Sequence, residues 1–265
     1  MEIKVLGTVS PWPKDDMNCP GFLVTEGDNR ILLDCGNGST SLLDKYKELR
    51  NLTVIISHYH PDHYGDIFVL GNATYVQHKL GYLEKRVKVL LPTEIEEIKE
   101  NSKSKTTYGE NIEDYNFIKN TKHEHFFDFK TYAKKSSFKI GGINITFYKT
   151  IHALNAHAIK LESENGTLVY SSDTDYDEGL ADFAKNADIF ICEASFLKGQ
   201  EKGISHHLYA HEAGKLASIA NVNNLYLYHT YTELEKEDYL KEAIKEFPNT
   251  HILHEKDVLS LSKKI

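Results

Sequence analysis

Apolar residues in this chain gather in short runs, each bounded by glycine, proline, asparagine or aspartate. In the first third, runs typical of strands lie at 3–9, 21–26, 30–36 and 52–57. The turn sequence GDN between the second and third runs predicts a hairpin. Before the fourth run, apolar residues at helical spacing behind a Ser/Thr cap predict a helix at 39–49.

The second half of the chain repeats this alternation. It predicts strands at 143–152, 157–163, 166–173, 187–195 and 224–230, and helices at 177–185, 210–220 and 235–246. Two strand-rich halves, each flanked by helices, favour an α/β fold. We therefore expect sheets sandwiched between helical layers in a single domain, residues 1–265.

Residues 92–135 interrupt this pattern, because the stretch is rich in lysine, acidic residues and scattered aromatic residues. We interpret it as a mostly helical insertion with a solvated surface. The alternative is a lid or a dimer element whose aromatic side chains reach a pocket, since long insertions are often functional. The sequence leaves open which interpretation of this stretch holds and whether the protein forms a homodimer.

Composition and charge narrow the classes of function. Hydrophobic residues make up 40% of the chain and charged residues 26%, which is typical of a globular protein with a real core. The net charge of −8 and a pI near 6.0 disfavour extended nucleic-acid binding, which needs a basic face. The three cysteines are odd in number and far apart, so no disulfide framework is expected. No apolar run is long enough for a membrane span and the first residues resemble a strand, so we expect a cytoplasmic protein without membrane contact.

The stretch SHYHPDHYGD, residues 57–66, contains four potential metal ligands: His58, His60, Asp62 and His63. Imidazole nitrogens and carboxylate oxygens are the ligands that zinc prefers beside thiolates. His58 and His60 are two apart in an extended segment, so both can point the same way. Asp62 and His63 follow at the turn into a predicted helix, where they can face a second ion.

Four ligands cannot fill two metal sites, so others must come from elsewhere in the fold. His152, Asp173 and His229 are candidates, because each stands at the end of a predicted strand. In layered α/β proteins, sites assemble at such strand ends. Two ions about 3.5–4 Å apart can share a bridging hydroxide, and Asp173 could bridge them.

The segment HYHPDHYGD resembles the HxHxDH signature of the metallo-β-lactamase superfamily, and the later histidine, SSDT and histidine motifs follow in that family's order. The resemblance implies a four-layer αβ/βα sandwich and two Zn²⁺ ions, with Mn²⁺ or Fe possible at one position. It implies that the first ion is held by His58, His60 and His152, the second by Asp62, His63 and His229, and that Asp173 bridges both. In redox-active di-iron relatives an acid occupies the position of His60, so the histidine favours a zinc hydrolase.

Two further segments resemble the ribonuclease-Z-like branch of this superfamily. They are GTVSPWP…NCPGFLV at 7–24 and SHHLYAHEAGKLA at 205–217. The second implies that His207 donates a hydrogen bond or a proton near a scissile phosphate. Tyr209 stands where threonine is common, and the adjacent His206 leaves the register of the motif open. The interval 152–173 has no room for a tRNA-gripping arm of the kind that tRNA 3′-processing members carry.

We therefore expect a dinuclear zinc-dependent hydrolase, and specifically a phosphodiesterase that acts on a small or nucleotide-like diester through a metal-bound hydroxide. Asp62 and Asp173 would orient the nucleophile, and His207 would protonate the leaving alkoxide. The alternative is an acyl hydrolase, such as a lactonase or thioesterase, on the same fold. A tRNA 3′-processing endonuclease and a non-catalytic metal-binding module are less favoured.

Two other polar residues have two interpretations each. Asp34, in the run ILLDCG, is either a strand-end cap or the hydrogen-bond acceptor of a ligand imidazole. His157 either lines the pocket or is a packed polar residue at the start of a strand.

Overall fold

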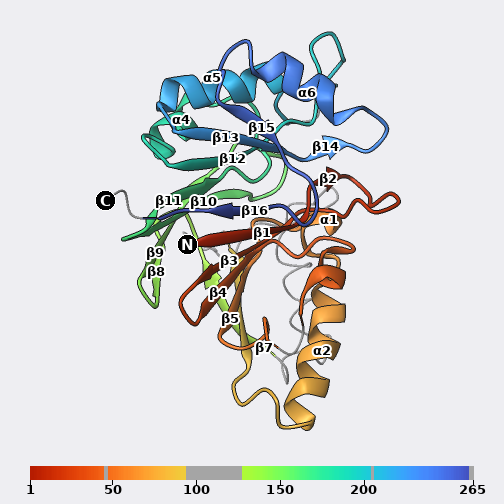
Figure 1. Ribbon diagram of the computed structural model, residues 1–265, viewed down its shortest axis with the longest axis vertical. Helices are drawn as coiled ribbons and strands as arrows, with labels where there is room; N and C mark the ends of the chain where they lie inside the picture. The colour runs from red at the N-terminus through yellow and green to blue at the C-terminus, as the bar shows by residue number, and fades with distance from the viewer. Residues whose placement is uncertain (45–46, 94–126, 204–205, 263–265) are drawn as a thin grey trace, which may run out of the picture.

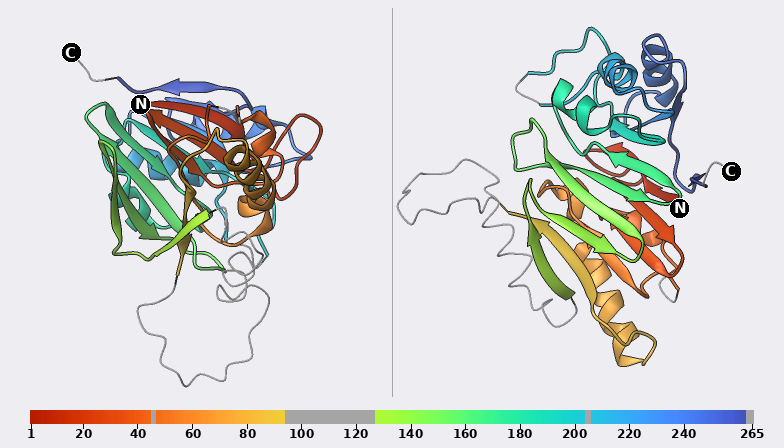
Figure 2. Two further views of the ribbon diagram at one scale, coloured as in Figure 1. Left: turned by 90° about the horizontal axis from the view of Figure 1, so that it is seen from below. Right: turned by 90° about the vertical axis from the view of Figure 1, so that its left-hand side faces the viewer.

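The computed structural model describes residues 1–44, 47–93, 127–203 and 206–262. Figure 1 and Figure 2 show two β-sheets facing each other, with helices on their outer sides. Within these residues, each sheet has seven strands, in the orders β16-β1-β3-β4-β5-β6-β7 and β15-β13-β12-β11-β10-β9-β8. The arrangement is the four-layer αβ/βα sandwich that the sequence predicts.

The first sheet consists of β1 (Glu2–Gly7), β3 (Gly21–Glu26), β4 (Asn29–Leu33), β5 (Leu52–Ile55), β6 (Val87–Pro92), β7 (Phe127–Tyr132) and β16 (Val258–Ser260). The second consists of β8 (Ser137–Ile140), β9 (Ile143–Lys149), β10 (His157–Ser163), β11 (Gly166–Tyr170), β12 (Ile189–Glu193), β13 (Asn224–Tyr228) and β15 (Thr250–Ile252). The hairpin predicted at GDN joins β3 and β4.

Helices cover both outer faces. The first sheet carries α1 (Pro61–Tyr64) and α2 (Ile67–Lys79), and the second carries α4 (Glu178–Phe183), α5 (Ala210–Ala220) and α6 (Lys236–Ala243). Among the described residues, no helix combines the length and apolarity needed to cross a bilayer.

The strand β10 shows how the apolar pattern builds the layers. Ile159 and Leu161 are buried in a cluster that draws side chains from both sheets, whereas Ala158, which precedes Ile159, packs in the cluster beneath α4, α5 and α6. Because side chains alternate across a strand, one strand can serve two cores. A third cluster lies between the first sheet and α2.

Parallel pairing places the carboxyl ends of several strands side by side. Strands β4 to β7 run parallel, and so do β11, β12, β13 and β15. The carboxyl ends of parallel neighbours meet at one edge, which is where polar loops can converge. A small parallel pair, β2 (Val9–Ser10) with β14 (Thr230–Tyr231), connects segments that follow strands of different sheets.

Two predicted elements differ from the structure. In the described part of 39–49, which omits residues 45 and 46, the predicted helix is replaced by the 3₁₀ helix η1 (Ser39–Leu42). Leu43 is extended, and the carbonyl of Leu42 accepts the Lys4 ammonium at 2.8 Å, so the chain leaves the helical path there. Apolar spacing alone could not show this competing interaction.

The predicted insertion at 92–135 overlaps the sheet at both ends. Its last part forms β7, which pairs in parallel with β6. The ring of Tyr132 in β7 is buried and stacks on Phe147, with ring centroids 3.9 Å apart, so this segment belongs to the core. Residues 94–126, on which the helical interpretation mainly rests, lie outside the described residues.

We predict that Leu161→Ala lowers the free energy of unfolding by roughly 2–5 kcal/mol, because it leaves a cavity between the sheets. Urea denaturation followed by circular dichroism measures the change. Ile219→Ala is the matched control: Ile219 on α5 is 51% exposed, so its truncation should change stability by no more than about 0.5 kcal/mol. Equal effects of the two substitutions would contradict this assignment of the core.

Candidate metal centre

The seven candidate ligands all lie beyond the carboxyl ends of strands, in loops or at the start of a helix. After β5 come His58 and His60, followed by Asp62 and His63 in α1. From the second sheet come His152 after β9, Asp173 after β11 and His229 after β13. Only His229 follows its strand directly, since β9 and β11 end three residues before the residues predicted to close them.

The first group combines His58, His60, His152 and Asp173, whose ligand atoms all lie within 4.8 Å of one another. The Nδ1 atom of His60 is 3.0 Å from Nε2 of His58 and 3.1 Å from Nε2 of His152. Two atoms that each lie about 2 Å from one ion are themselves about 3 Å apart. The spacing therefore fits the donor set of a single metal ion.

The second group combines Asp62, His63 and His229. The Nε2 atoms of His63 and His229 are 3.2 Å apart, and Oδ2 of Asp62 lies 3.5 Å from Nε2 of His229. The hydroxyl of Ser10 donates to the same Asp62 oxygen at 2.9 Å and fixes the carboxylate. This donor set also suits one metal ion.

Asp173 faces both groups. Its Oδ2 is 3.5 Å from Nε2 of His58, while its Oδ1 is 3.2 Å from Nε2 of His63 and 3.3 Å from Nε2 of His229. Oδ1 is buried and accepts no hydrogen bond from the described residues. A buried anionic oxygen without a donor is costly unless a cation compensates it, so the position suits a carboxylate shared by two ions.

One buried carboxylate, Asp34, fixes the second ring nitrogen of two candidate ligands, directly in His63 and through a hydroxyl in His58. Nδ1 of His63 donates to Asp34 at 2.7 Å, and Nδ1 of His58 lies 3.0 Å from the hydroxyl of Ser57, which itself donates to Asp34 at 2.8 Å. The hydroxyl of Tyr170 donates to the same carboxylate at 2.6 Å. Of the two interpretations of Asp34, the structure therefore supports the acceptor for a ligand imidazole.

The loop backbone is strained at this site. Asp34, Ser172 and His229 are non-glycine residues with φ between 55° and 62°. Residues in this left-handed region cost free energy and persist where the surroundings hold them. The amide of His229 donates to the carbonyl of Thr8, which belongs to the segment between β1 and β2.

Burial and nearby charges shift the pKa values of the candidate ligand imidazoles in opposite directions. Burial lowers the pKa of His58 and His152, and it lowers the pKa of His60 to about 4, so these rings are neutral at pH 7, the form that binds metal. Burial alone would lower the pKa of His63 as well, but Asp173 and the other nearby carboxylates raise it. The second group is thus a place where positive charge is favoured.

His207 lies beside both groups. Its ring centroid is 5.1 Å from that of His229 and 5.2 Å from that of His152. The side chain of His206, by contrast, is 44% exposed and lies 3.7 Å from Asp175, away from the cluster, and only its backbone carbonyl reaches a candidate ligand, accepting from Nδ1 of His152 at 3.1 Å. The structure thereby places His207, and not its neighbour, at the candidate site.

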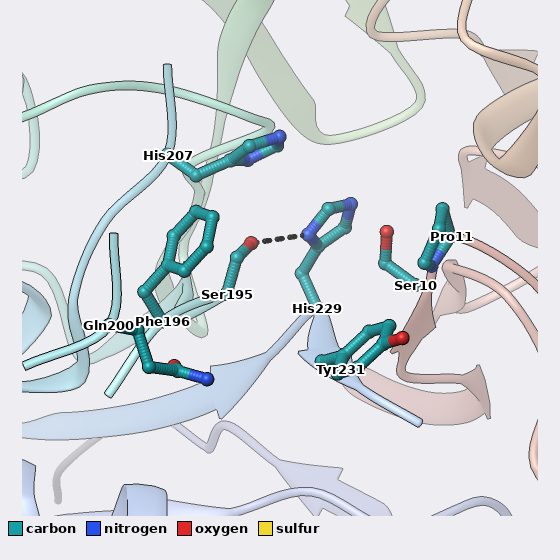
Figure 3. A pocket seen from close by; sticks show the side chains of 8 residues that line it. All are labelled: Ser10, Pro11, Ser195, Phe196, Gln200, His207, His229 and Tyr231. Carbon is teal, nitrogen blue, oxygen red and sulfur yellow. Dashed lines mark hydrogen bonds between the residues drawn. The ribbon is translucent and has the colours of Figure 1, made fainter. Parts of the chain in front are cut away.

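Sequence reasoning missed Glu193, the last residue of β12. Its side chain is fully buried and accepts hydrogen bonds from Nδ1 of His207 at 2.9 Å and from the hydroxyl of Ser195 at 2.8 Å. The hydroxyl of Ser195 in turn lies 2.8 Å from Nδ1 of His229, and a dashed line marks this contact in Figure 3. Burial alone would lower the pKa of His207, but Glu193 raises it to about 9. In the sequence, the role of Glu193 was indicated by no more than an acidic residue at the end of the apolar run IFIC.

His157 begins β10, as predicted, but its side chain does not join the candidate donor sets. The ring is buried and packs edge-on against Tyr132, with centroids 5.3 Å apart. The packed polar interpretation is therefore the correct one. The three cysteines are buried and unpaired, as the sequence predicts.

We predict that Asp34→Asn weakens metal binding roughly 10- to 100-fold, because the amide cannot accept hydrogen bonds as a carboxylate does. Asparagine tolerates the left-handed backbone of this position, so the fold should be kept. Bound metal, measured by mass spectrometry after dialysis against zinc buffers, reports the change. Asp188→Asn is the control that should bind metal normally, because Asp188 lies just before β12, at the end of that strand opposite to Glu193. Unaltered zinc affinity of Asp34→Asn would exclude this role.

Comparisons with known proteins agree with the fold and show the family. A family model described as anti-Pycsar protein Apyc1 matches residues 1–254. The probable metallo-hydrolase YhfI of Bacillus subtilis is 30% identical over 236 residues, covering 86% of each chain. A crystal structure of the metallo-β-lactamase fold protein YhfI matches with a TM-score of 0.81 at 26% identity, covering 97% of this chain and 98% of that one.

More distant matches point the same way. Ribonuclease Z of Thermococcus sibiricus is 26% identical over 284 residues, covering 92% of this chain and 91% of its own. A diphosphatase from the PhnP family matches with a TM-score of 0.73 over 99% of both chains, and at 13% identity this likeness shows the fold alone. The chain thus belongs to the anti-Pycsar protein Apyc1 family, within the ribonuclease-Z-like branch of the metallo-β-lactamase superfamily.

Proposed function

We propose that this protein is a dinuclear zinc-dependent phosphodiesterase that acts on a small or nucleotide-like diester. The observation that carries the proposal is the pair of donor groups with Asp173 facing both, and the His207–Glu193 pair beside them. A metallo-hydrolase is also what the name of YhfI states, and ribonuclease Z, by its name, acts on RNA.

The donor chemistry fits two zinc ions. His58, His60 and His152 would hold the first, Asp62, His63 and His229 the second, and Asp173 both. Nitrogen and oxygen donors of this kind also accept Mn²⁺ or Fe at one position. When bound, such ions lower the pKa of water to supply a nucleophile and stabilise charge on phosphoryl oxygens.

The side chains of the protein perform the remaining tasks. Asp62, held by Ser10, would orient the attacking water together with Asp173. Glu193 raises the pKa of His207 to about 9, which favours the protonated ring that a general acid needs. Since Nδ1 of His207 is committed to Glu193, Nε2 is the atom that would give its proton to the leaving alkoxide.

A large tRNA substrate is less well supported. The interval 152–173 contains β10, β11 and the turn between them, with no arm that could grip an RNA. The net charge of −8 also disfavours a long polyanion. A compact diester is therefore the better candidate.

Hydrolysis of model substrates tests the class of reaction. After metal quantification, we expect turnover of bis-(p-nitrophenyl) phosphate, and little turnover of p-nitrophenyl acetate or a lactone. Turnover of the ester or the lactone alone would favour the acyl hydrolase. A fully metallated protein that is inactive on all three would instead indicate a binding module.

We predict that His207→Ala lowers phosphodiester turnover by roughly 10²–10⁴-fold, the usual contribution of a general acid, while both metals stay bound. Steady-state rates and metal content measured on one preparation separate the two effects. His211→Ala is the control, because His211 on α5 pairs with Glu242 away from the cluster. Loss of metal from His207→Ala would show that His207 is a ligand instead.

A double-mutant cycle extends this prediction to Glu193. If Glu193 acts through His207, Glu193→Gln alone slows turnover, but adding it to His207→Ala has little further effect. Additive losses would mean that Glu193 serves the site by another route, for example through Ser195, with which it also hydrogen-bonds.

A further inference from the structure

The segment 8–10, which leads from β1 into β2, contacts two of the three candidate ligands in the second group. The carbonyl of Thr8 accepts from the amide of His229 at 2.6 Å, and the hydroxyl of Ser10 donates to Oδ2 of Asp62 at 2.9 Å. Within the described residues, no hydrogen bond joins this segment to a histidine of the first group. The segment therefore serves one group and not the other.

The carbonyl of Thr8 holds His229 in a strained conformation. With a φ of 62°, His229 lies in the left-handed region, which a residue with a side chain keeps only where its surroundings hold it. Its amide is fixed by Thr8, and its ring by Ser195 at 2.8 Å. A displacement of Thr8 would release the backbone that directs this ring toward the second group.

Thr8 is itself anchored by a buried lysine. The ammonium of Lys236, the first residue of α6, donates to the hydroxyl of Thr8 and to the carbonyl of Leu253, both at 2.8 Å. The hydroxyl of Thr8 donates in turn to Oε1 of Glu255 at 2.8 Å. Oε2 of Glu255 is 3.6 Å from the ammonium, and the side chains of Lys236 and Glu255 are only 9% and 10% exposed. The three side chains thus form a closed and nearly buried ring.

Glu255 also holds the same segment through its backbone. Oε1 of Glu255 accepts from the amide of Asn18 at 3.3 Å. The carbonyl of Asn18 accepts from the amides of Thr8 at 2.8 Å and Val9 at 3.0 Å. Both the side chain and the backbone of Thr8 are therefore fixed by this one carboxylate.

The charged pair is costly to bury, which indicates a role beyond packing. A buried ion pair often contributes no more stability than apolar residues of the same volume, because its charges must leave water. Burial lowers the pKa of Lys236, and Glu255 opposes this effect. Within the described residues, neither side chain hydrogen-bonds to a candidate ligand, so their influence on the centre passes through the segment that they hold.

We propose that Lys236 and Glu255 are positioning residues for the second metal ion. Through Thr8 they hold the amide of His229, and through the segment 8–10 they hold the hydroxyl that fixes Asp62. They set the affinity of the second group for its ion, whereas the first group is independent of them. This inference rests on the dinuclear centre of the proposed function and names the residues that govern one of its two ions.

Zinc titration of the metal-free full-length protein measures the two affinities without catalysis. A chromogenic chelator competes for zinc, so its absorbance yields a dissociation constant for each ion. His152→Ala and Asp62→Ala each remove a ligand of one group, and they thereby assign the two constants to the two groups.

Two variants test the anchor. Thr8→Val removes the hydroxyl and keeps the shape of the side chain. Lys236→Met combined with Glu255→Gln removes both charges together, so that neither is left buried without a partner. We expect each variant to weaken binding of the second ion roughly 10-fold and to change that of the first by less than about 2-fold, because the loss of hydrogen bonds behind a ligand weakens the ion that this ligand holds.

Lys4→Met is the matched control. Lys4 also donates to a backbone carbonyl, that of Leu42 at 2.8 Å, and it pairs with Glu48 at 3.1 Å. Its loss should lower the stability measured by urea denaturation and leave both zinc affinities unchanged. If Lys236 had only a structural role, its loss would likewise leave the ratio of the two affinities unchanged.

The outcomes separate this role from the reaction itself. Unchanged affinity for both ions in the two test variants, an equal loss at both ions, or the same selective loss in Lys4→Met would each overturn the positioning role. If the second ion is selectively weakened but the unaltered protein hydrolyses no diester, the positioning role stands and the proposed function fails. If diesters are hydrolysed and both affinities are unchanged in the variants, the proposed function stands and the positioning role fails.

Discussion

The carboxylate of Asp173 is buried between two groups of imidazoles, and the architecture of the site follows from that position. A buried negative charge requires compensating positive charge close by. Here Oδ2 faces the group around His58, and Oδ1 faces His63 and His229. Because those histidines come from opposite sheets, the site exists only when the two halves of the sandwich are packed together.

Two further buried carboxylates orient the ligands around this centre. Asp34, from the first sheet, holds His63 directly and His58 through Ser57. Glu193, from the second sheet, holds His207 directly and His229 through Ser195. Each sheet thus contributes an acid that directs ring nitrogens toward the centre, which is how outer hydrogen bonds tune metal sites.

Much of the fold and of the site could be predicted from local sequence. Strands were predicted well where apolar runs were short and bounded by turns, as at β5 and β13, because burial and backbone pairing act on neighbouring residues. The close spacing of His58, His60, Asp62 and His63 made the metal site recognisable, since four ligand-type residues in one short segment rarely have another purpose. The helix predicted over 39–49 does not continue past Leu42, because the Lys4 side chain, distant in sequence, binds the carbonyl of Leu42.

The sequence by itself determined the two-sheet α/β architecture and the identity of the candidate ligands, because apolar periodicity and clustered histidines are local properties. Only the tertiary structure decided that His207 and not His206 faces the centre, that Glu193 supports it, and that Lys236 holds Thr8. These relations depend on which strand ends and loops become neighbours once the sheets pack. That pairing is set by contacts between residues far apart in the chain, which no local pattern records.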